Sequence, residues 1–169
     1  MEEEGISEIS AWCGARHRPE PPRVLERQTR FTASEIKLMY RGFKQECPSG
    51  VVDEDTFKHI FSQFFPLGDA SQYAHYVFNT VRHKHSPNIN FEEFLLALSR
   101  VARGSTQDKI SWVFALYDTD GDGAISKAEL VSVVRAVYQL LGRGAAPPAA
   151  DSDVLEHATR VFTALAAVL

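Results

Sequence analysis

Cysteine is scarce in this chain of 169 residues, which holds only Cys13 and Cys47. Neither belongs to a C-x-x-C spacing, so we expect reduced thiols and an intracellular, cytoplasmic protein. No apolar run approaches the roughly 18 residues that a transmembrane helix needs. The opening MEEEGISEIS has no basic or apolar region of the signal-peptide kind, and Glu2 stands where N-myristoylation needs glycine. We therefore expect neither a secreted nor a membrane-spanning protein.

A strong excess of one charge is also lacking. The formal net charge is −4, and no basic stripe is present, which disfavours nucleic acid as a partner. We find no nucleophile with a matching base and no glycine-rich phosphate cradle, because the GRG at 142–144 is too short. We therefore expect a protein that is not an enzyme. A hydrophobic content of 44% is enough for one compact domain or two small lobes.

The most informative segment that is present is DTDGDGAISKAE at 118–129. It meets every diagnostic position of the calcium-binding EF-hand loop, including Gly123 at the sharp turn. Calcium takes six to eight oxygen ligands, which alternating carboxylates and one backbone carbonyl can supply. An acidic surface turn that binds nothing is the alternative. The predicted ligands, at loop positions 1, 3, 5, 7, 9 and 12, are Asp118, Asp120, Asp122, Ala124, Ser126 and Glu129.

The same skeleton occurs twice more, upstream. Each copy has a turn residue, an apolar residue two positions later and an aromatic residue or leucine five beyond that. The turn residues lie 37 and 36 residues apart, a period that indicates a repeated helix–loop–helix unit. The three copies are Gly50–Val52–Phe57, Pro87–Ile89–Phe94 and Gly123–Ile125–Leu130.

The first two loops have lost the metal chemistry. Loop 45–56 has Cys47 at a ligand position and Thr56 where the bidentate glutamate belongs, and loop 82–93 begins with Arg82. A cationic loop with few carboxylates should not hold calcium. A transition-metal site at His83 and His85 is the alternative to solvated loop histidines, and no further ligands are fixed nearby.

Capping residues predict where the helices begin. Thr32 with Glu35, and Ser126 with Glu129, have the capping-box spacing. The second box shares its glutamate with the metal site, so binding calcium and starting that helix are one event. Further helices are expected after Asp53, over 71–81, around Phe91, Phe94, Leu95 and Leu98, after Ser105 with Ile110, Val113, Phe114 and Tyr117 on one face, and over 153–169 following a loop at 142–150.

Aromatic residues are unusually dense between positions 40 and 98. An amphipathic partner helix can lie in a hydrophobic groove between EF-hand helices. For any single aromatic residue, a place in the core is the simpler interpretation. The set that we predict to form a partner groove is Tyr40, Phe43, Phe57, Ile60, Phe61, Phe64, Tyr73, Tyr76 and Phe78.

The segment at 31–79 resembles the Kv channel-interacting proteins, the KChIP and calsenilin group of neuronal calcium sensors. CPSG in a dead first loop is typical of the wider sensor superfamily, and RGFK, QFFP, GDAS and YAHY together indicate the KChIP branch. The resemblance covers roughly residues 15–162. It implies an all-α fold of EF-hand repeats similar to calmodulin and recoverin.

The resemblance also implies a division of the chain. A variable, disordered segment is expected at 1–30, and a pair of EF-hands with degenerate loops at 31–100. An incomplete C-terminal lobe is expected at 105–169, because relatives carry four hands and this sequence reaches about the first helix of the fourth. We expect one Ca²⁺ site, with Mg²⁺ as an alternative resting occupant, and weaker calcium binding than in those relatives. The last helix should expose an apolar stripe and favour homo-oligomers.

The function implied by the resemblance is that of an auxiliary subunit of A-type voltage-gated potassium channels. The partner would be the cytoplasmic N-terminal segment of the channel's α subunit, and the protein would tune gating and surface delivery at the plasma membrane. One alternative is a decoy that binds channels without responding to calcium. Another is a calcium-regulated transcriptional repressor of the calsenilin type, which would add the nucleus as a second compartment.

Overall fold

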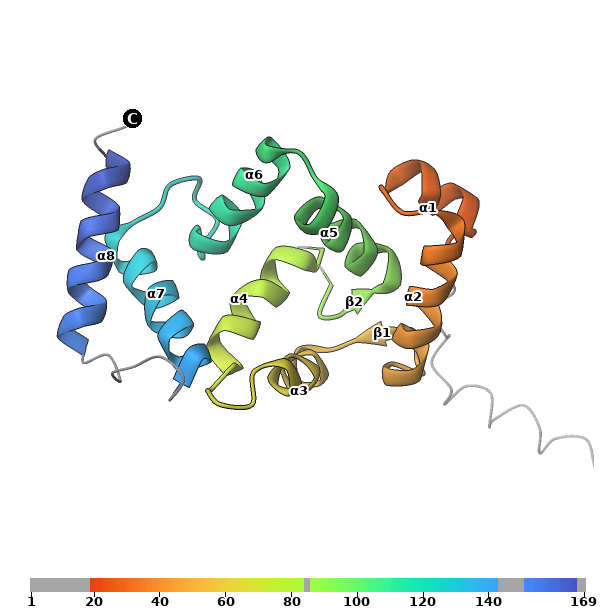
Figure 1. Cartoon of the computed structure of the whole chain (residues 1–169), viewed down its shortest axis with the longest axis horizontal. Helices are drawn as coiled ribbons and strands as arrows, with labels where there is room; N and C mark the ends of the chain where they lie inside the picture. The colour runs from red at the N-terminus through yellow and green to blue at the C-terminus, as the bar shows by residue number, and fades with distance from the viewer. Residues whose placement is uncertain (1–18, 84–85, 143–150, 167–169) are drawn as a thin grey trace, which may run out of the picture.

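The computed structural model describes residues 19–83, 86–142 and 151–166, and within these ranges the chain is all-α, as the sequence predicts (Figure 1). None of the described helices is both long enough and apolar enough to cross a membrane. In chain order the elements are α1 (Pro22–Gln28), α2 (Ala33–Glu46), β1 (Val51–Val52), α3 (Glu54–Phe64), α4 (Ser71–Val81), β2 (Ile89–Asn90), α5 (Phe91–Arg103), α6 (Thr106–Tyr117), α7 (Lys127–Leu141) and α8 (Asp151–Ala166).

Capping side chains set the helix starts where the sequence predicts them. Thr32 and Glu35 form a reciprocal capping box at α2, and Asp53 accepts from the Thr56 amide at α3. Each cap satisfies an amide that has no partner within the helix, which fixes the first turn. A further capping box, which the sequence analysis missed, joins Asn90 and Glu93 at the start of α5.

The first two helix–loop–helix units pair through their loops. Strands β1 and β2 are antiparallel, and Val52 lies opposite Ile89. Both residues stand at position 8 of their loops, so the pairing follows from the repeat. Both side chains are buried together with Phe78, and this cluster joins the loops to the helices.

Helix α1 corrects the expectation that residues 1–30 are disordered. Residues 1–18 lie outside the described ranges, but Pro22–Gln28 is helical and Leu25 is buried. Leu25 and Phe31 pack with Ile36, Phe91 and Leu95 in one cluster that joins α1, α2 and α5. Proline at the first helical turn fits the start of α1, because it lacks only an amide that the helix does not use.

Helix α8 corrects a second expectation, that of an uncovered apolar stripe. Val154 and Ala158 are buried against Leu130 and Val134 of α7, with Phe162 partly buried beside them. The apolar face of α7 therefore covers the stripe at these residues, and the homo-oligomer stays a prediction. Figure 1 shows α7 and α8 together at one end of the molecule, and α1 and α2 at the other.

An ion pair fastens the end of α5 to the start of α2. Arg103 Nη2 lies 2.6 Å from Glu35 Oε1, and the guanidinium stands over the ring of Phe31. The hydrogen bond from Arg103, followed by the one from the Thr32 amide, lowers the pKa of Glu35 from 4.5 to about 2. A carboxyl group whose pKa is lowered by folding stabilises the fold above pH 4.5, and this contribution disappears as the pH falls toward 2.

We therefore expect Arg103→Gln to reduce the acid sensitivity of folding. The wild type should lose more stability than the variant between about pH 5 and pH 2, because only the wild type holds Glu35 far below its ordinary pKa. Urea midpoints measured across this range test the expectation. Lys37→Gln removes the same charge from α2 and should behave as the wild type does. Parallel pH curves for the wild type and Arg103→Gln would contradict it.

Candidate metal centre

The loop at 118–129 lies between two helices whose ends it shapes. Helix α6 ends at Tyr117, and α7 starts after Ser126, whose side chain accepts from the Glu129 amide. The Glu129 carboxylate accepts in return from the Ser126 amide at 2.8 Å, which completes the predicted capping box. Gly123 has φ +88°, a conformation that other residues rarely adopt, so the predicted turn residue stands where the turn is.

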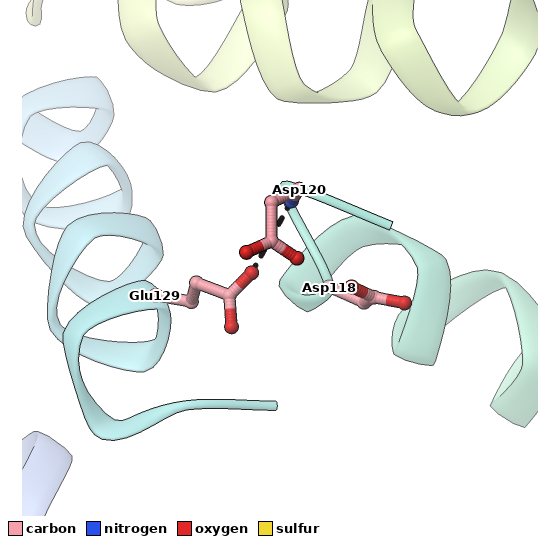
Figure 2. A group of neighbouring side chains, drawn as sticks. All are labelled: Asp118, Asp120 and Glu129. Atoms are coloured by element: carbon pink, nitrogen blue, oxygen red, sulfur yellow. Dashed lines mark hydrogen bonds between the residues drawn. The ribbon is translucent and has the colours of Figure 1, made fainter. Parts of the chain in front are cut away.

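Three carboxylates converge in this loop. Asp118, Asp120 and Glu129 each place an oxygen within 4.8 Å of the others. Figure 2 shows Glu129 reaching from the start of α7 toward Asp120 in the loop. Three carboxylates held this close repel one another, and a bound cation would offset the repulsion. Because the donors are all oxygens, they suit a hard cation such as Ca²⁺ or Mg²⁺.

Glu129 closes the loop through hydrogen bonds to its first residues. Its Oε1 accepts from the Thr119 amide at 2.8 Å, from the Thr119 hydroxyl at 3.1 Å and from the Asp120 amide at 3.3 Å. The side chain is buried, with 9% of its surface exposed. The backbone hydrogen bond from Ser126 is the largest cause that lowers the pKa of Glu129 to about 2, so the carboxylate is charged at neutral pH.

The aspartates shape the loop from inside. Asp118 accepts from the amides of Asp122 and Gly123, both at 3.1 Å, and Asp122 accepts from the Ala124 amide at 2.8 Å. These bonds curve the backbone around the carboxylates of Asp118 and Asp120. The loop is thus shaped in part by its own acidic side chains.

The structure brings together three of the six predicted ligands. Asp118, Asp120 and Glu129 form the cluster, whereas Asp122 bonds within the loop and Ser126 caps α7. Calcium coordination by these six residues, including the carbonyl of Ala124, stays a prediction. Thr119 is a contributor that the sequence analysis missed, because position 2 of the loop has no diagnostic residue.

The second loop has the cation Arg82 at its first position, where the acidic loop has Asp118. Arg82 Nη1 donates to the carbonyl of Ser86 at 3.1 Å, inside the loop. Glu93 accepts from the His83 amide at 3.1 Å, the counterpart of the bond between Thr119 and Glu129. Glu93 therefore contacts the start of its loop as Glu129 does. The predicted alternative of a site at His83 and His85 cannot be followed further, because His85 lies outside the described residues.

The first loop is closed by core packing. Cys47 is buried beside Val52, Phe78 and Ile89, and burial raises the pKa of its thiol. The Lys44 ammonium donates to the carbonyl of Pro48. Cys47, at a ligand position of the loop, is thus part of the core, and the Lys44 cation contacts the loop backbone. In the part of the chain that the structure describes, the cluster at Asp118 is the one metal-type grouping of His, Cys, Asp or Glu side chains.

The predicted groove residues fall into different surroundings. Tyr40 and Phe43 pack on Phe91, with ring centroids 5.0 and 5.4 Å away. Ile60 packs partly buried against the cluster around Phe78, and Tyr76 lines a cleft of about 780 Å³ between α4 and the start of the acidic loop. Phe78 is buried at the centre of the first hand pair, so its prediction as a partner contact was wrong for this state of the protein.

Phe57 and Phe61 of α3, Tyr73 of α4, and Phe65, which directly follows α3 and was not among the predicted groove residues, form what we call the aromatic row. The ring centroids of Phe57 and Phe61 are 5.8 Å apart, those of Phe61 and Phe65 5.2 Å, and those of Phe61 and Tyr73 6.0 Å. Phe64, the last residue of α3, is 73% exposed. A partner role for these residues stays a prediction.

Comparison with known protein families finds the EF hand domain over residues 109–137. The match spans most of α6, the acidic loop and most of α7, the segment that holds the carboxylate cluster. The chain therefore contains an EF-hand, which implies calcium binding. An all-helical protein of this kind is typical of calcium-binding regulators that are not enzymes.

Proposed function

We propose that this protein is a calcium-binding auxiliary subunit of A-type voltage-gated potassium channels. It binds the cytoplasmic N-terminal segment of the channel α subunit as an amphipathic helix, and calcium at residues 118–129 modulates the complex. In this role it acts in the cytoplasm, at the plasma membrane through the channel. The observation that carries the proposal is the exposed apolar end of α3 beside the aromatic row, in a chain that also has the carboxylate cluster at 118–129.

The end of α3 has the properties of a docking surface for a helix. Phe64 and Leu67 are 73% and 70% exposed, and in the sequence they flank Phe65, whose ring stacks on that of Phe61. Covering large apolar side chains that face water is favourable, so a partner that buries them gains binding free energy. Aromatic anchors of this kind dominate the affinity of many interfaces.

Calorimetry with a peptide from the N-terminal segment of the channel tests the proposal. We expect Phe64→Ala to weaken binding by about tenfold or more, the size of effect found for an anchor residue. Because Phe64 is exposed, the variant should remain folded. Leu38→Ala is the matched control, since Leu38 is 69% exposed and belongs to α2, whereas the aromatic row lies on α3, just after it, and on α4. No binding by the wild type, or equal binding by both variants, would remove the proposal.

Recordings from cells that express the channel then decide the direction of the effect. An enlarged current that changes with intracellular calcium supports an auxiliary subunit that delivers channels to the surface. A suppressed current with peptide binding intact would instead indicate the decoy. Glu129→Gln separates the calcium contribution in the same cells, because it alters the metal loop and changes no residue of α3.

A further inference from the structure

The end of α7 is fastened to the turn between α3 and α4 by direct backbone contact. The Asp69 amide donates to the carbonyl of Gln139 at 2.8 Å. A Cβ atom added to Gly68 would overlap the carbonyl oxygens of Gln139 and Leu140. We call this contact, between residues 67–69 and 139–142, the clasp.

Gly142 completes the clasp from the other side. Its φ is +54°, and a Cβ there would overlap the carbonyl oxygen of Leu67. Both glycines therefore allow an approach that a side chain would prevent. A contact this close transmits displacement, because neither backbone can move toward the other without a clash.

Helix α7 connects the clasp to the metal loop. Glu129, which closes the loop, lies in the first turn of α7, and Gln139 lies near its end. At a rise of 1.5 Å per residue, the two are about 15 Å apart along an unbroken helix. Leu130, Val133 and Ala136 are buried along the same helix, so its packing is continuous from the loop toward the clasp. A shift of its first turn therefore reaches the clasp.

The other helix of the metal hand holds α4 at a second point. Trp112 of α6 donates from Nε1 to the Thr80 hydroxyl, at 3.2 Å, near the end of α4. The start of α4 adjoins the clasp, because Asp69 also accepts from the Ser71 amide at 2.9 Å. Helix α4 is thus attached at one end to α6 and at the other to α7. A change in the angle between α6 and α7 would therefore act on both ends of α4.

We propose that the clasp couples calcium binding at residues 118–129 to the end of α3 and the turn after it, which carry the exposed side chains of Phe64 and Leu67. The inference rests on the calcium role of that loop. A calcium ion that fixes Glu129 and the first turn of α7 tightens the clasp and holds the turn in one arrangement. Because coupling between two sites is reciprocal, loosening the clasp must weaken calcium binding by the same factor.

Amide hydrogen exchange and calorimetry on the full chain, with and without saturating calcium, test the coupling. In the wild type we expect the Asp69 amide to exchange about tenfold more slowly with calcium, within the range typical of coupled sites. In Gly68→Ala the calcium affinity should fall by about the same factor, and Asp69 exchange should no longer respond to calcium. Gly42→Ala is the matched control, since a Cβ at Gly42 meets nothing within 4 Å.

The outcomes separate the clasp from the metal site. If the wild type binds no calcium, both the proposed metal site and the proposed coupling are wrong. If calcium binds but Asp69 exchange is unchanged, only the proposed coupling is wrong. The same holds if Gly68→Ala and Gly42→Ala bind calcium with equal affinity. Circular dichroism shows whether Gly68→Ala is folded. If it is not, Gly142→Ala disrupts the clasp from the α7 side. The comparison of wild-type amides decides the question even if both variants fail to fold.

Discussion

Replacing Glu129 by glutamine is expected to abolish the calcium response of this protein. Glu129 is the acidic residue that joins both ends of the loop, through Thr119 and Ser126. Glutamine keeps the capping geometry of α7, because an amide oxygen can also accept from the Ser126 amide. It loses the negative charge and the second carboxylate oxygen. We therefore expect the calcium affinity to fall on the order of 100-fold.

Fluorescence of Trp112 provides the readout. Trp112 lies on α6, six residues before the loop, and its hydrogen bond to Thr80 reports the position of that helix. The chain has two tryptophans, so a Trp12→Phe background isolates the signal. A saturable change with calcium in this background, absent in Glu129→Gln, is the expected result.

The chain supplies a matched control at Glu93. This glutamate stands at the same loop position, forms a capping box with Asn90 and accepts from the His83 amide. Glu93→Gln therefore makes the same chemical change in a loop whose first residue is the cation Arg82, which donates to the Ser86 carbonyl. It should leave the calcium titration unchanged. A comparable loss of calcium affinity in both variants would show that Glu129 acts through general stability and not as a ligand.

Elements with local signals could be predicted from the sequence. The caps at Thr32, Asp53, Ser105 and Ser126 are local hydrogen bonds between residues three positions apart, so spacing alone identifies them. The carboxylate cluster belongs to the same class, because a loop of twelve residues can bring its own side chains together. These features needed no knowledge of the remainder of the fold.

Burial could not be predicted in the same way. The apolar spacing of Ile110, Val113 and Phe114 correctly predicts a helix, yet all three side chains are exposed on α6. Periodicity shows that residues share a face, whereas burial depends on which other element packs against that face. The same reason explains α8, whose stripe is covered by α7, and Phe78, whose surroundings come from β1, β2 and α3.

Helix α1 is the element that the sequence signal least supported. Seven residues with one buried leucine, between prolines and charges, have no amphipathic period to detect. Its stability comes from the cluster with Phe31 and Phe91, which lie outside the helix. The importance of such a segment can be measured by removing its one buried side chain.

Leu25→Ala is therefore expected to destabilise the whole first hand pair. Leu25 is 1% exposed and packs among Phe31, Ile36, Phe91 and Leu95. Truncating a buried leucine typically costs about 2–5 kcal/mol, from lost burial and the cavity left behind. The free energy of unfolding in urea measures this cost. Exchange of the Thr29 amide, which donates to the Leu25 carbonyl at 2.9 Å, shows whether α1 itself has opened.

Leu38→Ala makes the same truncation on the surface of α2, where the side chain is 69% exposed. A surface change of this kind usually alters stability by no more than about 0.5 kcal/mol. If residues 19–30 were a disordered leader, the two leucines would behave alike, and Thr29 would exchange as fast as a free peptide. A loss confined to Leu25→Ala would instead place α1 inside the cooperative unit that holds α2 and α5 together. The surface that the first hand pair offers a partner would then depend on a segment with almost no sequence signal of its own.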